Sequence, residues 1–422
     1  MEKLKVIVIG AGGRGKGYTD TMAKYPEKYQ VVGVAEPIDD RREYVKNKHN
    51  IPEENCFVTW EHILERPKFA DIAIISTMDR MHFAPAMEAI RKGYNLLLEK
   101  PVAPTAEECK KIEAESKKYG VKILVCHVLR YTPFFLALKN LIDSGEIGKV
   151  MSIQHSECVG NTHQSHSFVR GNWGNSERSS TMLLQKSCHD MDILQWLVGK
   201  ECKRASSFGS RTYFTIENAP EGAPEYCIEG CPHADTCYYN AVKLYLEAKS
   251  NDWFRPASTG LVNPTDEEVE HAIRTTQYGK CVYKCDNDVV DHQVVNLEFE
   301  DGTVVDFNMC AFNEGGRFIR IMGTKGEIVN SGDGSDVTLY KFSDKSHTKI
   351  DINAYGNTIE SGHGGGDEGI INALYDYITS GVVTEQLSEI GISVKNHMIA
   401  FAAEESRISG KVVNVKEFAD SI

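Results

Sequence analysis

The 422-residue sequence lacks several features that would assign it to other classes of protein. No apolar run approaches the roughly 20 residues that a transmembrane helix needs, so no membrane partner is expected. Positive charge is in deficit, with 47 lysines and arginines against 60 acidic residues and a net charge of −13, and no basic stripe is visible. This balance argues against a nucleic-acid partner. Repeats, low-complexity tracts and a long linker are also absent, and the length then predicts two globular domains.

The N-terminus leaves no room for a signal peptide, because a strand-like apolar run, Leu4–Ile9, begins almost at once. The expected location is therefore the cytoplasm. Hydrophobic residues make up 41% of the chain and charged residues 25%, which is typical of a globular protein.

A glycine-rich turn follows this first apolar run and is the most informative motif of the chain. Gly10, Gly12 and Gly15 form a G-x-G-x-x-G pattern, and a second apolar run, residues 31–35, ends at Glu36. In a dinucleotide-binding βαβ unit such glycines allow a tight turn and bring the pyrophosphate close to a helix N-terminus. The acid accepts hydrogen bonds from the adenosine ribose. The pattern therefore predicts a nicotinamide dinucleotide site.

The residues that follow the second apolar run affect the choice between NAD and NADP. Glu36 would repel a 2′-phosphate, which favours NAD over NADP. Arg41 and Arg42 follow closely and could neutralise such a phosphate, so NADP stays open.

The first third of the chain alternates between strand and helix patterns. Further strand-like runs lie at residues 56–60, 71–76, 95–98 and 122–126, with helical stretches such as Ala106–Tyr119 between them. This alternation predicts a doubly wound parallel sheet of the Rossmann type over residues 1–130.

The rest of the chain, residues 131–422, predicts an α+β domain for substrate binding and oligomerisation. Strands are expected at Val150–Cys158 and repeatedly from residue 291 onward, in a large, mainly antiparallel open sheet. Flanking helices are expected at residues 181–198, 368–379 and 389–409. A cysteine-rich insertion spans about residues 215–290.

Two groups of polar residues stand where a site is expected. Lys100, in Glu99-Lys100-Pro101, comes at the carboxyl end of a predicted parallel strand, where ligands bind in open α/β sheets. Lys186, His189 and Asp190 are spaced at i, i+3 and i+4, so on a helix they would project from one side.

The sequence resembles the Gfo/Idh/MocA family of NAD(P)-dependent sugar and inositol oxidoreductases over essentially its whole length. The resemblance rests on the glycine turn, on Ser76, Thr77 and His82 after the fourth strand, on the Glu-Lys-Pro tripeptide and on residues 186–192. It implies that Lys100 is the catalytic lysine and that His189 is the acid/base near the substrate hydroxyl. It also implies a homodimer or homotetramer that forms through the second domain.

The resemblance and the motifs together define the expected site. The expected cofactor contacts are Gly10, Gly12, Gly13, Arg14, Gly15, Glu36, Arg41, Ser76, Thr77, His82, Glu99 and Lys100. The expected catalytic groups are Lys100, His189 and Lys186, and the expected substrate contacts are Arg130, Tyr131, Gln185 and Asp190. His127, His163 and the polar run 363–367 are weaker candidates.

One position departs from the family pattern. Many members carry an aspartate four residues before the histidine, and here that position is Gln185. A neutral amide cannot hold His189 as a carboxylate does, and Lys186 beside it is a candidate second cation at the site.

The twelve cysteines are numerous for a chain without an export signal, and several cluster in the insertion. Cys227, Cys231 and Cys237 lie in a turn-rich stretch, with Cys281 as the expected fourth member and Cys285 as its alternative. A structural zinc ion would tie such a stretch down. Free buried thiols, an iron–sulfur cluster and a redox disulfide remain alternatives.

The chemistry of these residues predicts reversible oxidation of a secondary hydroxyl of a sugar, cyclitol or glycoside by hydride transfer to NAD. Histidine supplies a base near neutral pH, and a nearby ammonium stabilises the developing alkoxide. A redox-neutral glycosidase that retains its NAD is an alternative, and a non-catalytic dinucleotide-binding regulator is a further one.

Overall fold

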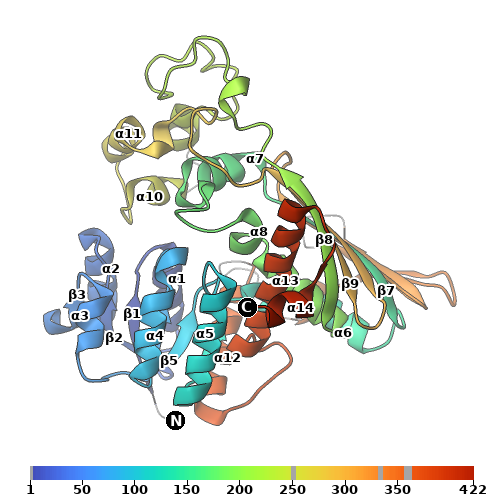
Figure 1. Cartoon of the computed structure of the whole chain (residues 1–422). Helices are drawn as coiled ribbons and strands as arrows, with labels where there is room; N and C mark the ends of the chain where they lie inside the picture. The colour runs from blue at the N-terminus through green and yellow to red at the C-terminus, as the bar shows by residue number, and fades with distance from the viewer. Residues whose placement is uncertain (1–2, 249–252, 331–335, 356–363) are drawn as a thin grey trace.

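The computed structural model describes residues 3–248, 253–330, 336–355 and 364–422. Two sheets organise these residues, a six-stranded one in the first domain and a nine-stranded one in the second (Figure 1). The strands are β1 (Leu4–Ile9), β2 (Tyr29–Ala35), β3 (Cys56–Phe57), β4 (Ile72–Ile75), β5 (Asn95–Leu98), β6 (Ile123–Val125), β7 (Val150–Cys158), β8 (Cys202–Ser210), β9 (His292–Phe299), β10 (Val304–Cys310), β11 (Gly316–Gly323), β12 (Gly326–Asn330), β13 (Val337–Lys341), β14 (His347–Ile350) and β15 (Val413–Asn414). The α-helices are α1 (Gly13–Met22), α2 (Asp39–His49), α3 (Trp60–Glu65), α4 (Phe83–Arg91), α5 (Ala106–Tyr119), α6 (Pro133–Asp143), α7 (Asn161–His163), α8 (Met182–Gln185), α9 (Cys188–Val198), α10 (Phe254–Thr259), α11 (Asp266–Thr275), α12 (Gly366–Ser380), α13 (Ile390–Ser409) and α14 (Val415–Asp420).

The first sheet has the strand order β3-β2-β1-β4-β5-β6, and all of its pairings are parallel. The strand order reverses between β1 and β4, and ligands bind outside the carboxyl ends of the strands at such a switch point. The predicted doubly wound sheet is confirmed.

Alternating side chains of β1 build the two apolar layers around this sheet. Leu4, Val6 and Val8 pack toward α1, α2 and α12, whereas Ile7 and Ile9 pack toward α3, α4 and α5. Because α12 comes from the C-terminal part of the chain, the domain boundary expected near residue 130 separates the two sheets but not all of their helices.

The second sheet has the order β14-β13-β12-β11-β7-β10-β9-β8-β15. Its pairings are antiparallel except that of β7 with β10, so the expected mainly antiparallel sheet is confirmed. Helices α6, α9 and α13 pack on its inner face. The outer face carries polar side chains such as Gln154, Asp306 and Asn308, together with the exposed Phe318.

The insertion between β8 and β9 rises above both sheets and contains α10 and α11 (Figure 1). It contributes most of two small apolar clusters, one around Phe214 and Tyr283 and the other around Tyr245 and Phe254. It reaches the first domain, where the backbone N–H of Val262 donates a 2.6 Å hydrogen bond to the Asp40 carboxylate.

Three details differ from the sequence-based expectations. The strand expected at residues 56–60 ends at Phe57, because Thr59 is already the N-cap of α3. The single helix expected at residues 181–198 is two helices, α8 and α9, that are separated at Lys186 and Ser187. Strand β8 was not expected, because its polar and small residues give a weak apolar alternation.

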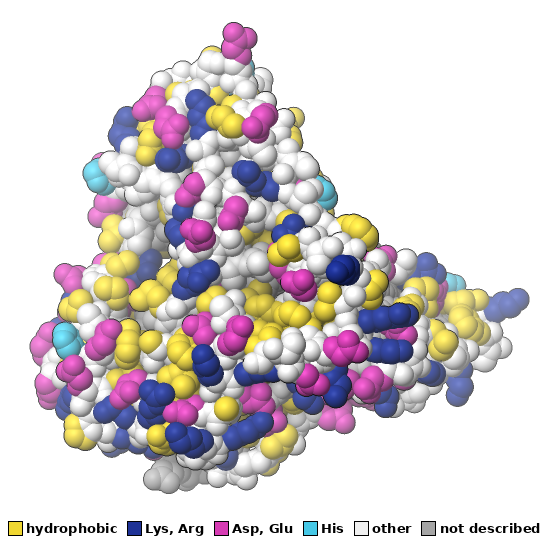
Figure 2. All heavy atoms as spheres, viewed as in Figure 1, with side chains coloured by type: hydrophobic (Ala, Val, Ile, Leu, Met, Phe, Trp, Pro, Cys, Tyr) yellow, Lys and Arg dark blue, Asp and Glu magenta, His cyan; other side chains and the backbone are white. Residues whose placement is uncertain are grey.

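Charge is mixed over the visible face of the molecule, where Figure 2 shows basic and acidic side chains interspersed rather than gathered by sign. None of the helices within the described ranges has both the length and the apolar composition that crossing a membrane requires.

Candidate active site

The glycine turn is crowded in the way that a dinucleotide-binding turn requires. Gly10 has a φ of +87°, and a Cβ on it would lie 2.6 Å from the carbonyl oxygen of Ser76. A Cβ on Gly15 would lie 2.0 Å from the carbonyl oxygen of Gly10. Around Gly13, by contrast, a Cβ would have no heavy atom within 4 Å. The turn therefore packs α1 tightly on β1 and β4 and leaves the helix N-terminus open to a phosphate.

Glu36 stands at the end of β2 beside this turn. Its buried carboxylate accepts hydrogen bonds from the backbone N–H groups of Ala11 at 2.7 Å and Ile38 at 3.0 Å. Arg41 reaches toward Gly12, with its Nη1 3.5 Å from the position of a Cβ there. Arg42 instead donates to the carbonyl oxygen of Glu36 at 2.6 Å. An acid and one basic side chain thus lie at the position of the adenosine ribose.

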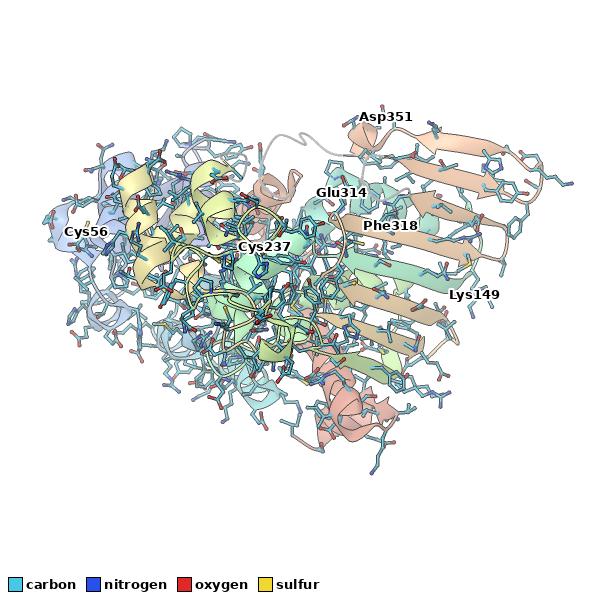
Figure 3. All side chains as sticks on the ribbon, turned by 90° about the horizontal axis from the view of Figure 1, so that it is seen from above. Cys56, Lys149, Cys237, Glu314, Phe318 and Asp351 are labelled. Atoms are coloured by element: carbon cyan, nitrogen blue, oxygen red, sulfur yellow. The ribbon has the colours of Figure 1, made fainter. Side chains whose placement is uncertain are left out.

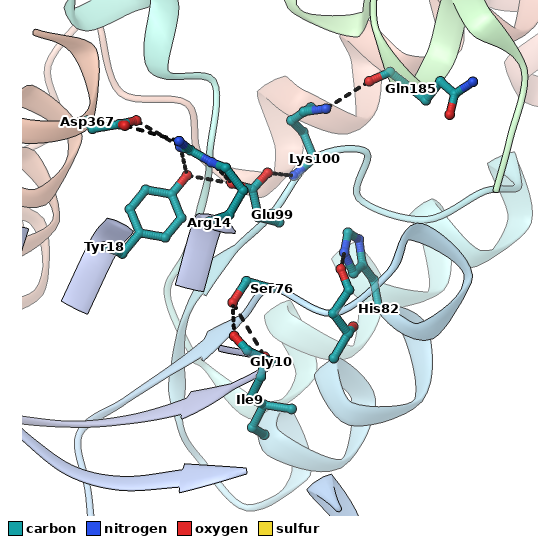
Figure 4. Close-up of polar contacts among 11 residues, drawn as sticks. Ile9, Gly10, Arg14, Tyr18, Ser76, His82, Glu99, Lys100, Gln185 and Asp367 are labelled. Carbon is teal, nitrogen blue, oxygen red and sulfur yellow. Dashed lines mark hydrogen bonds and ion pairs between the residues drawn. The ribbon is translucent and has the colours of Figure 1, made fainter. Parts of the chain in front are cut away.

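The loop after β4 holds the next three expected contacts together. The Ser76 hydroxyl donates a 2.7 Å hydrogen bond to the Gly10 carbonyl, and the ring of His82 lies between the carbonyl oxygens of Pro101 and Thr77 at 2.7 and 3.1 Å (Figure 4). The Thr77 hydroxyl oxygen is buried without a hydrogen-bond partner among the described residues. An orphaned hydroxyl beside the open glycine turn fits a bound dinucleotide, which would supply the missing partner.

Arg14 pairs with acidic residues from both parts of the chain and does not project freely at the open N-terminus of α1. Its Nε lies 2.8 Å from Glu99, and its two terminal nitrogens contact Asp367 of α12 at 2.8 and 3.0 Å (Figure 4). Tyr18 donates to Glu99 at 2.6 Å. Burial would raise the pKa of Glu99, but Arg14 and Lys100 lower it below its ordinary value. Asp367 belongs to the polar run expected at 363–367, whose His363 lies outside the described residues.

Lys100 follows β5 directly and points across to the second domain. Its backbone N–H donates to Glu99 at 2.9 Å, and its Nζ donates to the backbone carbonyl of Gln185 at 2.8 Å (Figure 4). The lysine is partly exposed, so its ammonium is held in place and remains open on one side.

Two histidines, the buried His127 and the half-buried His189, pack against each other. The ring of His189, at the start of α9, packs edge to face on the ring of His127, with centroids 5.7 Å apart. Lys100 is one of the charges that act on His127 and on Cys188, the neighbour of His189. Burial lowers the pKa of His127, so this ring stays neutral.

A charged cluster lies on the inner face of the second sheet. Lys186 Nζ lies 3.3 Å from Glu157, and Arg317 pairs with Glu157 and, at 3.0 Å, with Asp190. His155 Nε2 lies 2.9 Å from the same Asp190 oxygen. Burial opposes the ionisation of Asp190, yet Arg317 and His155 lower its pKa well below its ordinary value. The cluster therefore contains two cations and two anions.

Sequence reasoning missed Glu157, Arg317 and His155. Glu157 and Arg317 are register partners in the antiparallel pairing of β7 with β11, which the sequence does not reveal. A signal was present in β7, where His155 and Glu157 occupy the same face as the buried Ile153. Polar residues on the apolar face of an amphipathic strand indicate a buried polar cluster.

The side chain of Gln185 is engaged within the protein. Its amide nitrogen donates to the carbonyl of Trp173 at 2.7 Å, and its oxygen lies 2.7 Å from the hydroxyl of Ser179. Ser179 and the Trp173 indole in turn contact Asp79 of the first domain, at 2.6 and 3.1 Å. Gln185 thus joins the two domains near Lys100, and its expected contact with substrate stays a prediction.

Arg130 and Tyr131 are both buried, and Asp192, the partner of Arg130, also lies 3.9 Å from Nδ1 of His127. Arg130 forms a two-pronged ion pair with Asp192 at 2.7 and 2.8 Å, and Asn396 also donates to that carboxylate. Tyr131 packs in the apolar cluster that α12 shares with the first sheet. These contacts give both side chains a structural role, and the substrate contacts expected for them stay predictions.

The remaining candidates lie in or near the insertion. Burial and the charge of Lys186 lower the pKa of His163, which stands in α7. All twelve cysteines are free thiols. Cys227, Cys231, Cys237 and Cys281 line one cavity, whereas Cys285 does not. The zinc expectation is not confirmed, because no three ligand-type side chains in the described ranges converge on a single-ion site.

Curated proteins of similar sequence include oxidoreductases and dehydrogenases. The curated protein named oxidoreductase YteT of Bacillus subtilis is 24% identical over 84% of each chain. Inositol 2-dehydrogenase of Salmonella typhimurium is 24% identical over 49% of this chain, and the match spans 58% of that protein.

The same fold is found in solved structures at low sequence identity. A levoglucosan dehydrogenase in complex with NADH and levoglucosan superposes with a TM-score of 0.71 at 18% identity and covers 98% of this chain and 100% of the other. An oxidoreductase of Agrobacterium radiobacter in complex with NAD+, L-tartaric acid and magnesium superposes with a TM-score of 0.70 at 16% identity over 99% of each chain.

Two family models match most of the chain. Residues 4–127 match the NAD-binding Rossmann fold of the GFO/IDH/MocA oxidoreductase family, and residues 139–380 match the C-terminal alpha/beta domain of that family. The chain is therefore a member of the Gfo/Idh/MocA family of NAD(P)-dependent oxidoreductases.

Proposed function

We propose that the protein reversibly oxidises a secondary hydroxyl of a sugar, cyclitol or glycoside, with NAD as the hydride acceptor. One observation carries this proposal: the ammonium of Lys100 is fixed at the carboxyl end of β5, between the glycine turn and the second domain. A hydroxyl that binds there lies near a cation, near His189 and near the open end of α1. When bound, the dinucleotide supplies the hydride acceptor at C4 of its nicotinamide.

The protein's own residues then handle the proton and the charge. His189 takes the hydroxyl proton as the hydride leaves, and neutral His127 packs against its ring and limits its movement. Lys100 stabilises the negative charge that develops on the substrate oxygen. The carbonyl of Gln185 positions the ammonium, since it accepts one of its three N–H groups.

The charged cluster beneath the site favours a polyhydroxylated substrate. Lys186 and Arg317 are each about one-fifth exposed, so part of each cation can meet a ligand while Glu157 and the buried Asp190 hold it in place. Fixed donors of this kind bind hydroxyl oxygens without needing a net charge on the ligand. Lys186 is therefore the proposed second cation at the substrate.

Glu36 supports NAD as the cofactor, because its carboxylate is buried at the place of the ribose hydroxyls. Arg41, near Gly12, is the group that could admit NADP. Side-by-side titration of NAD and NADP by isothermal calorimetry measures this preference.

A second candidate function has one observation in its favour. The insertion contacts α2 beside the cofactor site, where Val262 binds Asp40 and Gly260 approaches Ile38 and Arg41. A segment placed there would slow the release of NAD. A redox-neutral glycosidase uses such retention: oxidation at C3 acidifies C2–H, the aglycone is eliminated, water adds, and the hydride returns to C3.

The deciding experiment combines native mass spectrometry of the purified protein with an NADH-absorbance assay on a panel of sugars, inositols and glycosides. Net reduction of added NAD by one compound supports the dehydrogenase and identifies its substrate class. Bound NAD, no net absorbance change and cleavage of a glycoside support the redox-neutral function. If no compound is oxidised, reduced or cleaved, the proposal of catalysis on a carbohydrate hydroxyl is rejected.

We also propose that the protein forms a homodimer or homotetramer through the outer face of the second sheet. This face exposes the apolar side chains of Phe208, Val304 and Phe318, which lie on β8, β10 and β11 (Phe318 is labelled in Figure 3). Light scattering coupled to gel filtration tests this assembly, and a monomer at micromolar concentration contradicts it. The cytoplasmic location expected from the sequence stays a prediction.

A further inference from the structure

The insertion brings four cysteines to the wall of one cavity. Cys227, Cys231 and Cys237 come from a turn-rich segment, and Cys281 comes from the chain 44 residues later. Figure 3 shows Cys237 within the insertion, apart from the isolated Cys56 of the first domain. The cavity wall contains Cys281 but not Cys285, whose Sγ points to the carbonyl of Cys281 at 3.4 Å. His233 is in the wall too, but its Nε2 is bound to the Glu221 carbonyl at 2.8 Å.

A buried arginine lies in the same wall. Arg170 is 1% exposed and forms no ion pair with a carboxylate in the described part of the chain. Its Nε and Nη2 donate to the carbonyls of Lys280 at 2.7 Å and Tyr239 at 2.6 Å, and Nη2 also lies 3.7 Å from the sulfur of Cys227. Its Nη1 is buried without a hydrogen-bond partner among the described residues.

A buried cation without an anion is costly, and four protonated thiols do not compensate it. Thiolates bound to a metal do, because a doubly charged cation with four thiolates is a net anion. An iron–sulfur cluster with four cysteine ligands is an anion for the same reason. The guanidinium without a carboxylate partner and the four cysteines in one cavity wall are two separate features, and both favour an anionic metal–thiolate centre.

We propose that Cys227, Cys231, Cys237 and Cys281 bind a metal centre as four thiolates and that Arg170 compensates its negative charge. The centre has a structural role. It ties the segment of residues 227–237 to Cys281, between two apolar clusters that are each too small to hold this segment alone.

The spacing that the four sulfurs can reach distinguishes zinc from an iron–sulfur cluster. Tetrahedral zinc at about 2.3 Å from each sulfur needs sulfurs about 3.8 Å apart. The cysteines face one cavity, but no three of the described ligand-type side chains converge on a single ion. Zinc would therefore require side-chain rotation around the cavity, and a four-cysteine iron–sulfur cluster, whose thiolates bind different iron atoms, is the second candidate.

The test is elemental analysis of untagged protein that is purified without chelator, once in air and once without oxygen. We expect near-stoichiometric metal in at least one preparation: either zinc in a colourless protein, or iron with acid-labile sulfide and absorbance near 400 nm. Cys227→Ser, Cys237→Ser and Cys281→Ser should each lose at least half of that metal. Cys285→Ser and Cys56→Ser are the matched controls and should keep it.

Three results overturn the proposal. The first is metal-free wild-type protein in both preparations, and the second is a disulfide between any two of the four cysteines in intact-mass and peptide mapping. The third is metal that the Cys285→Ser control loses as fully as the Cys281→Ser variant. Because the wild-type metal content is decisive by itself, failure of the serine variants to fold does not remove the test.

Discussion

The Nζ atom of Lys100 donates a 2.8 Å hydrogen bond to the backbone carbonyl of Gln185. That carbonyl is available because α8 ends at Gln185, and the last carbonyls of a helix have no partner within it. The break between α8 and α9 thus provides the carbonyl that holds Lys100, the lysine that we propose as catalytic, across from the other domain. In a continuous helix the Gln185 carbonyl would accept a hydrogen bond from a backbone N–H of the next turn, and the Lys100 ammonium would lose this partner.

Replacement of Lys100 by methionine should remove catalysis and spare cofactor binding. The Nζ atom stabilises charge only as the reaction proceeds, so kcat should fall by about 10² to 10³ while the Kd for NAD changes by less than about threefold. Steady-state kinetics and calorimetry measure the two values. Lys92→Met, on the surface after α4, is the control. Full turnover in Lys100→Met would show that the ammonium is not part of the reaction.

Two glycines of α1 should respond oppositely to alanine. Gly15→Ala places a Cβ 2.0 Å from the Gly10 carbonyl, so it should push α1 off the sheet and weaken NAD binding at least tenfold. At Gly17 a Cβ meets nothing within 4 Å, and alanine there should stabilise the helix by about 0.5 to 1 kcal/mol. Thermal unfolding and NAD titration of both variants check this contrast, which equal effects would contradict.

Glu36→Gln should weaken NAD binding and reduce the discrimination against NADP. The glutamine amide keeps the size of the side chain but lacks its negative charge. The carboxylate accepts hydrogen bonds from the N–H groups of Ala11 and Ile38, and its charge repels a 2′-phosphate. We expect the Kd for NAD to rise by about tenfold, since hydrogen bonds to a charged group contribute about 1.5 to 3 kcal/mol. Asp39→Asn, at an exposed carboxylate nearby, is the control. Unchanged NAD affinity in Glu36→Gln would contradict the ribose contact.

The stability of the fold should decline as the pH falls from about 6.5 toward 3. Burial lowers the pKa values of His166 and His397 to about 3, so the folded protein stays unprotonated in this range while the unfolded chain takes up protons. Each histidine then removes about 1.4 kcal/mol per pH unit, and its contribution is fully present only above pH 6.5.

Urea unfolding at several pH values measures this slope, and His397→Gln isolates one of the two protons. The Nε2 of His397 accepts from the Val102 N–H at 3.0 Å, and its Nδ1 lies 2.7 Å from the Ser393 carbonyl. Glutamine can make both contacts without titrating. An identical slope in the variant and the wild type would exclude His397 as a source of the effect.

Asp192→Asn should destabilise the fold strongly, because it leaves Arg130 buried without its ion-pair partner. Breaking one side of a buried pair costs about 3 to 5 kcal/mol, and the loss is measured as the change in the free energy of unfolding. Asp143→Asn, whose carboxylate pairs with Lys139 on the surface, should cost less than about 1 kcal/mol. A mild effect of Asp192→Asn together with a raised KM would instead support the substrate contact expected of Arg130.

The local motifs could be located from the sequence because their physics is local. The turn at Gly10, the acid at Glu36 and Lys100 at the end of β5 lie within single βαβ units, where strand and helix periods fix their positions. The partners of these groups could not be located in this way. Arg14 was expected at a phosphate but is bound by Asp367, which is 353 residues away in the chain.

The sequence by itself predicted the family and the doubly wound first domain, and the roles expected for the glycine turn, Lys100 and His189 stay predictions. Only the tertiary structure shows that Arg317 lies opposite Glu157 and that Arg130 pairs with Asp192. It also shows that Cys281, and not Cys285, lines the cysteine cavity. The physical reason is that strand register and helix docking depend on the packing of side chains far apart in the chain, whereas turns and strand ends depend on their immediate neighbours.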